Sequence, residues 1–143
     1  MDTRLYNSLR KSIIFKDVSE VNFNEIVNEI PFRILDYKKN EILFFEGDDC
    51  NSIGIVLDGE VEVNKGLTIG KKVNITKIKA GDMFAEAVVF SQHHKFPATI
   101  EASSDSKVLF ISREKLVKMC SIYSVFIENF MGILSTKTSI LII

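Results

Sequence analysis

Between Phe32 and Ile111 the chain is a succession of short runs rich in β-branched and aromatic residues, and this pattern limits the possible folds most strongly. The runs are FRILDY, EILFF, SIGIVL, EVEVNK, KVNITKI and SKVLFIS. They are separated by turn signals at Glu46–Asp49, Asp58–Gly59, Lys65–Gly66, Ile69–Gly70 and Ala80–Asp82. Within two runs apolar and polar residues alternate, as in a strand with one buried face. The pattern predicts an antiparallel β-sandwich or barrel.

Helical periodicity flanks this region on both sides. Apolar residues recur at helical spacing from Leu5 onwards, and Pro31 ends that stretch because proline cannot continue a helix. From Arg113 the helical period returns without a proline, and it predicts one long helix to the end of the chain. We therefore expect a helical segment at 1–31, a β domain at 32–112 and a C-terminal helix at 113–143. The apolar ending Ser139–Ile143 leads us to expect that the chain is truncated.

Composition excludes several classes of protein. The chain has 143 residues, enough for one domain, and 18 Lys and Arg against 19 Asp and Glu give a net charge of −1. A domain that binds nucleic acid normally has more basic than acidic residues. We therefore do not expect this chain to bind DNA by itself. Two cysteines suit a reducing compartment, and no apolar run reaches the roughly 18 residues of a membrane helix. We expect a cytoplasmic protein without membrane contact.

Four motifs, in the same order along the chain, resemble the sensor domain of Crp/Fnr-type transcription regulators, a cyclic-nucleotide-binding-like domain. They are Glu46–Asp48, Val56–Val63, Ala80–Glu86 and Val108–Ser112. The resemblance implies a mainly β protein with flanking helices: an antiparallel jelly roll, or double-stranded β-helix, and a long C-terminal helix. It also implies an unknown small-molecule effector, a homodimer formed through that helix, and DNA binding only through a C-terminal helix-turn-helix domain that this chain lacks.

The segment that would hold a cyclic nucleotide departs from the family pattern. Cyclic-nucleotide binders of the family that this chain resembles share a Phe-Gly-Glu motif. About ten residues later this motif is followed by an Arg-Ser or Arg-Thr pair. Here the opening is Phe84-Ala85-Glu86, and the later pair falls on Phe96 and Pro97. Because a buried phosphate needs a guanidinium or an equivalent cation, we expect no response to cyclic AMP. The candidate effector-binding residues are Phe84, Ala85, Glu86, Phe96, Pro97, Ala98 and Thr99.

Three possibilities stay open for this site. Phe96 could form the wall of a pocket for an apolar or aromatic effector, or it could fill the pocket so that no ligand binds. Alternatively Lys95, or one of His93 and His94, could supply the missing positive charge. Glu86 has a second explanation as well, because an acidic residue is stabilised at the start of a helix even when nothing binds.

The C-terminal stretch carries more apolar side chains than packing on one small sheet can bury. Spacings of three, four and seven residues indicate a seam between two helices. The predicted dimer interface consists of Phe126, Phe130, Ile133, Leu134 and Leu141. The alternative is that part of this stripe packs under the β domain and the rest contacts the missing C-terminal domain.

Two other functions remain as alternatives: a metal-dependent enzyme of the cupin type, and a structural dimerisation module with a closed pocket. The chain has only two histidines, His93 and His94, and on a strand their side chains would point apart. No nucleotide loop, catalytic triad or paired-carboxylate site stands out, so we expect no enzyme activity, metal or cofactor. Cys120 is expected to be a buried, unreactive thiol, and the sequence assigns no role to Cys50.

Overall fold

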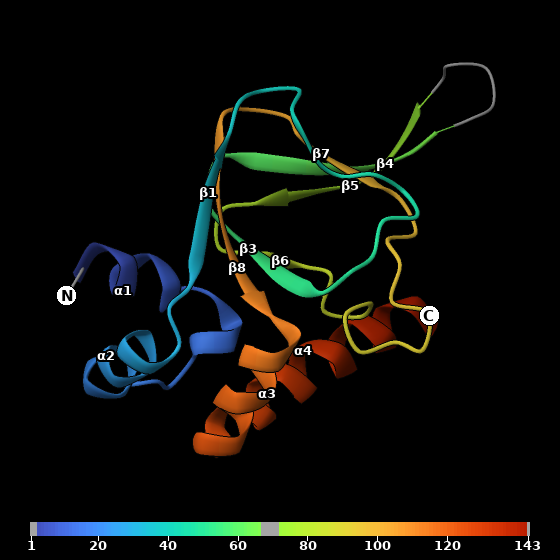
Figure 1. Cartoon of the computed structure of the whole chain (residues 1–143). Helices are drawn as coiled ribbons and strands as arrows, with labels where there is room; N and C mark the ends of the chain where they lie inside the picture. Colours follow the sequence, from blue (N-terminus) through green and yellow to red (C-terminus); the bar gives the residue numbers. More distant parts are fainter. Residues whose placement is uncertain (1–2, 67–71, 143) are drawn as a thin grey trace.

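In the described part of the chain, eight strands form two facing four-stranded sheets, with the helices gathered beneath them (Figure 1). The computed structural model describes residues 3–66 and 72–142, and the side chains of Thr3, Lys72, Ile75 and 137–142 are not described. The strands are β1 (Arg33–Tyr37), β2 (Ile42–Phe44), β3 (Ser52–Asp58), β4 (Glu60–Gly66), β5 (Lys72–Lys79), β6 (Met83–Phe84), β7 (Thr99–Ala102) and β8 (Ser106–Ser112).

All strand pairs are antiparallel, with the order β1-β8-β3-β6 in one sheet and β2-β7-β4-β5 in the other. The first strand pairs with the last, from Arg33 opposite Phe110 to Tyr37 opposite Ser106. Between the sheets the Phe44 ring of β2 contacts the rings of Phe84 and Phe110, with centroids 6.5 and 5.9 Å apart. The expected fold class, an antiparallel jelly roll with flanking helices, is confirmed.

The β3–β4 hairpin turns at Gly59, which has a φ of +83°. That conformation is costly for residues with a Cβ atom. A Cβ at Gly59 would also overlap the backbone oxygen of Asp105 and lie 2.8 Å from the Cα of Ser106. The neighbouring Glu60 N–H donates to the buried hydroxyl of Ser106 at 3.0 Å. The hairpin is therefore clamped against the loop before β8, and only glycine fits at its tip.

The N-terminal region forms α1 (Thr3–Leu9), a short 3₁₀ helix η1 (Ile13–Phe15) and α2 (Glu20–Glu29). The Ser19 side chain caps α2 by accepting a hydrogen bond from the Asn22 N–H at 3.1 Å. The rings of Phe15 and Phe23 lie 5.6 Å apart, and Phe15 also meets Phe126 at 5.6 Å. These buried aromatic contacts join the N-terminal helices to the C-terminal ones.

The C-terminal region forms two helices, α3 (Arg113–Ile122) and α4 (Ser124–Ile142), so the prediction of one long helix is wrong. The break is at Tyr123, whose backbone is extended at φ −127° and ψ 108°. The Tyr123 hydroxyl donates to Glu25 Oε2 on α2 at 2.6 Å, and its ring meets Phe126. The change of direction lets each helix bury its own apolar face, around Leu116 on α3 and around Phe126 on α4. Gly132 lies inside α4 without interrupting it.

Asn129 of α4 holds the N-terminal segment directly. Its side-chain Nδ2 donates to the backbone oxygen of Ile14 at 2.9 Å and to that of Lys16 at 2.8 Å. Each such bond contributes about 0.5–1.5 kcal/mol net. We expect Asn129→Ala to lower the free energy of unfolding by about 1–2 kcal/mol in urea denaturation. Glu128→Ala, at an exposed neighbouring position, is the control, and an equal loss in both variants would contradict the prediction.

Candidate functional site

The segment Gly81–Glu86 runs along the open edge of β3 and begins the expected binding region. It is fixed by two backbone bonds to β3, from Gly81 N to Val56 O at 2.8 Å and from Val56 N to Asp82 O at 3.0 Å. Ala85 adopts a left-handed conformation with φ +71°, at the position that is glycine in the family pattern. The Ala85 backbone oxygen accepts hydrogen bonds from the N–H groups of Val88 and Val89, and these bonds form a short turn. Glu86, within this turn, is buried.

Phe96 is part of the aromatic core. Its side chain is 3% exposed and stacks on the ring of Phe44, with centroids 4.2 Å apart and planes at 17°. Phe96, Pro97 and Ala98 line a cavity of about 110 Å³ with Phe84 and Ala85. Small-molecule sites usually have volumes of roughly 300–1,000 Å³. The space beside Phe96 is therefore too small for a nucleotide.

Lys95 does not supply the missing positive charge. Its Nζ lies 2.5 Å from Asp49 Oδ1, and this contact holds the pKa of the Asp49 carboxyl below its usual value. The same loop is fixed by backbone bonds to residues 47–50, including Phe96 N to Asp48 O at 2.9 Å and Cys50 N to His94 O at 2.7 Å. Lys95 is thus directed at an exposed partner on the turn before β3.

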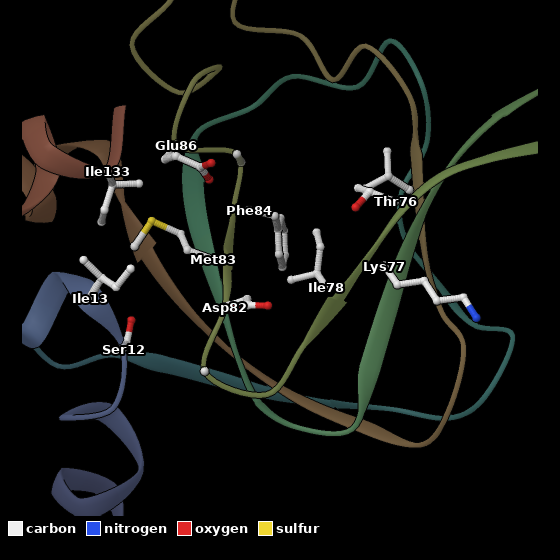
Figure 2. A pocket seen from close by; sticks show the side chains of 13 residues that line it. Ser12, Ile13, Thr76, Lys77, Ile78, Asp82, Met83, Phe84, Glu86 and Ile133 are labelled. Atoms are coloured by element: carbon white, nitrogen blue, oxygen red, sulfur yellow. The ribbon is translucent and has the colours of Figure 1, made fainter. Parts of the chain in front are cut away.

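A larger cavity, of about 460 Å³, is also lined by Phe84 and Ala85 (Figure 2). Its apolar wall comes from η1, β5, the 81–86 segment and α4, and includes Ile13, Ile78, Met83, Phe84 and Ile133. Its polar lining is Ser12, Thr76, Lys77, Asp82 and Glu86. The cavity thus joins the N-terminal segment, the roll and α4, and its volume suits a small molecule.

The predicted effector-binding residues divide between the two cavities. Phe84 and Ala85 line both, whereas Glu86 lines only the larger of the two and Phe96, Pro97 and Ala98 only the smaller. Thr99 lines neither, and its hydroxyl accepts the Glu46 N–H at 3.0 Å. The sequence interpretation missed Ser12 and Ile13, because the N-terminal segment carries no local sign that it reaches the site. Thr76 and Ile78 are two residues apart on one strand, so their side chains share a face. This spacing could have indicated that β5 forms a wall of the cavity.

The predicted dimer seam needs correction. Phe126, Phe130 and Ile133 are 0, 4 and 7% exposed, because they pack into this chain's own core. The Leu134 side chain is half-buried, and that of Leu141 lies outside the described residues. The exposed apolar residues of α4 are instead Ile127 and Met131, at 45 and 53% exposure. The helical period allowed either stripe to face outwards.

Ile127 and Met131 lie in a groove of about 580 Å³ between α3, α4 and the turn after Glu86. This groove, which we call the α4 groove, has an apolar lining of Phe90, Val117, Cys120, Ile127, Met131 and Leu134. Despite these apolar residues, none of the helices in the described ranges is long and apolar enough to cross a bilayer.

The cysteines and histidines are dispersed. Burial raises the pKa of the Cys50 thiol, which is fully buried, and that of the half-buried Cys120 thiol. His93 and His94 lie in the loop before Lys95. Among residues 3–66 and 72–142, His, Cys, Asp and Glu side chains form no group of three that could hold a metal ion.

Comparison with known proteins gives one matching family and several relatives. Residues 34–123 match the cyclic nucleotide-binding domain family. The chain is 26% identical over 81 residues to the anaerobic regulatory protein of Bacillus subtilis (strain 168), covering 57% of this chain and 34% of that protein. The chain thus spans about a third of the length of this curated relative.

The solved structures extend the similarity in fold. The sensor domain of the transcriptional regulator DNR from Pseudomonas aeruginosa has a TM-score of 0.81 at 18% identity, covering 99% of this chain and 95% of that one. The catabolite activator protein of Thermus thermophilus has a TM-score of 0.77 at 17% identity, covering 90% and 59%. Two of these three relatives are named as regulators and the third as an activator protein. The chain belongs to the cyclic nucleotide-binding domain family, and its structural neighbours include transcriptional regulators.

Proposed function

We propose that this chain is the effector-sensing and dimerisation domain of a Crp/Fnr-type transcription regulator, and that its effector is not a cyclic nucleotide. The observation that carries the proposal is the stacking of Phe96 on Phe44, where cyclic-nucleotide binders have an arginine. A phosphate beside these rings would be desolvated without a cation, at a cost of several kcal/mol. The effector site is the 460 Å³ cavity, where Glu86 lies between the roll and α4.

The dimer forms through the α4 groove. We propose that a second copy of this chain binds in the groove. The exposed apolar side chains of α4 follow one another along the helix, which is the arrangement that two packed helices need. Burying one such side chain contributes about 1.5–3 kcal/mol, so a few from each copy offset the entropy of association. The cavity and the groove share Glu86, and both are lined by residues of α4, the cavity by Ile133 and the groove by Ile127 among others. An effector in the cavity therefore acts on the helix that meets the partner.

DNA binding is proposed to reside outside this chain. The net charge of −1 offers no basic excess for phosphate contacts, and the curated relative is about three times as long as the matched region. In this proposal the domain reports effector binding through the arrangement of its dimer.

The test is calorimetric titration with cyclic AMP. We expect the unmodified chain to show no saturable binding below millimolar concentration, because Phe96 and Pro97 replace the phosphate-binding pair. The matched variant, Phe96→Arg with Pro97→Ser, restores that pair, and binding by this variant alone would show that the two positions carry the difference. Micromolar binding by the unmodified chain would refute the proposal that its effector is not a cyclic nucleotide.

A further inference from the structure

Ser12 brings a buried hydroxyl to the 460 Å³ cavity. The residue is 2% exposed, and its backbone groups are paired within the N-terminal segment. Its N–H donates to Leu9 O at 2.8 Å, and its oxygen accepts the Phe15 N–H at 3.1 Å. Its side chain does not cap η1, and in the described part of the chain no other group forms a hydrogen bond with the Ser12 hydroxyl. Because a buried hydroxyl without a partner is costly, this group is available to a ligand in the cavity.

The side chains around this hydroxyl are apolar. Figure 2 shows the Ser12 hydroxyl directed towards the side where Ile13 and Met83 lie, with Ile133 of α4 beside them. The ring of Phe84 continues the apolar wall. Ile13 is 62% exposed, so an apolar ligand in the cavity would cover this side chain and remove its surface from water. The cavity thus offers one buried hydrogen-bonding group within an apolar wall.

The charged groups that line the cavity do not select a charged ligand. Lys77 is exposed, and its Nζ lies 3.9 Å from Glu60 Oε1. Asp82 is exposed as well, and the buried Glu86 already interacts within this chain. A charged ligand would lose hydration without gaining a buried partner of opposite charge, whereas an uncharged ligand has no such cost. The described lining therefore favours an uncharged molecule.

We propose that the cavity binds an uncharged molecule with an apolar body and a hydroxyl or carbonyl group, which forms a hydrogen bond with the Ser12 hydroxyl. The inference rests on the proposed function, because it names the chemical class of the effector at the same site. A serine hydroxyl can donate to a carbonyl and accept from a hydroxyl, so both groups fit. Thr76 is the other hydroxyl among the described lining residues, and it is exposed, so it can stay hydrated. Ser12 therefore determines where the polar end of the effector lies.

The test uses four probes with the same aromatic ring: 2-phenylethanol, ethylbenzene, 2-phenylethylamine and phenylacetate. Each is titrated into the ¹⁵N-labelled chain, and shifts of the amide signals around the cavity give the affinity and the location. We expect 2-phenylethanol to bind more tightly than either charged probe. Ser12→Ala should weaken the binding of 2-phenylethanol roughly fivefold, which corresponds to about 1 kcal/mol, and should leave the affinity for ethylbenzene, which lacks the hydroxyl, unchanged.

Two further variants support this comparison. Ser12→Cys keeps the shape of the side chain but hydrogen-bonds only weakly, so it should show the same selective loss as Ser12→Ala. Ser8→Ala removes a hydroxyl from an exposed position of α1 that does not line the cavity, and it should leave all four affinities unchanged. The affinity for ethylbenzene reports in each variant whether the cavity is intact.

Three results would each overturn the inference. The first is a charged probe that binds as tightly as 2-phenylethanol. The second is a loss that is absent from both Ser12 variants, or that is equal for 2-phenylethanol and ethylbenzene. The third is the absence of shifts around the cavity with every probe. None of these results would alter the cyclic AMP titration or the oligomeric state, on which the proposed function is judged.

Discussion

Ile127→Glu combined with Met131→Glu is expected to convert a dimer into a folded monomer. Both side chains are about half exposed in the single chain, so glutamates there remain hydrated and leave the core intact. In a dimer the same positions lie in the α4 groove, where two unpaired carboxylates from each copy would be desolvated. The dimer dissociation constant should rise by at least a thousandfold, which corresponds to about 4 kcal/mol. Sedimentation at micromolar concentration measures the change.

The control for this experiment is Val21→Glu on α2, where an apolar residue is 67% exposed far from the α4 groove in sequence. That variant should sediment like the unmodified chain. Alkylation of Cys120, which lies in the groove, should become faster in the monomeric variant, whereas fully buried Cys50 should stay protected in both. A dimer that persists in the double variant, or an unmodified chain that is already monomeric, would refute the interface.

Gly59→Ala is expected to destabilise the fold by about 3 kcal/mol or more, a large part of a typical total stability of about 5–15 kcal/mol. Two costs add at this position. The left-handed φ of +83° strains any residue with a Cβ, and the new atom overlaps the backbone at Asp105 and Ser106. Neither segment can move easily, because Ser106 bonds to Glu60 on one side and lies in β8 on the other. Urea denaturation gives the difference in unfolding free energy.

Two further glycines separate these costs. Gly81 has a φ of +95° but open space at its Cβ position, so Gly81→Ala should cost about 1 kcal/mol from strain alone. Gly66 has neither a positive φ nor a neighbour within 4 Å, and Gly66→Ala should change stability by less than about 0.5 kcal/mol. Equal losses at Gly59 and Gly81 would show that the predicted overlap at Asp105 is relieved by movement.

Local signals explain why most of the roll was predictable. The run FRILDY contains β1, EILFF contains β2 and SKVLFIS matches β8, because alternation and turn residues act within a few positions. The strands that the pattern did not predict are β6 and β7. β6 has two residues and owes its conformation to pairing with β3, and β7 buries Glu101, whose carboxylate accepts the Asn64 side chain at 2.7 Å. Both depend on partners that are distant in sequence.

The site was only partly predictable for the same reason. The replacement of an expected arginine by Phe96 is visible in a motif, but its stacking partner Phe44 lies in β2, far earlier in the sequence. The helical period showed that the C-terminal stretch is apolar, yet it could not distinguish the core side at Phe126 from the open side at Ile127. No proline marks the break at Tyr123 in the sequence. The hydrogen bond from Tyr123 to Glu25 is seen only in the folded structure.

The pairing of β1 with β8 also determines when this chain can fold. Arg33 meets Phe110, and Asn129 reaches the backbone of Ile14 across 115 positions of sequence. Contacts of such long range must overcome loop-closure entropy before they contribute, so folding times of milliseconds to seconds are typical. During synthesis on the ribosome, β1 has no strand partner until β8 has emerged, and the backbone oxygens of Ile14 and Lys16 have no Asn129 side chain to bind until α4 follows. The N-terminal quarter of the molecule is therefore made first and completed last.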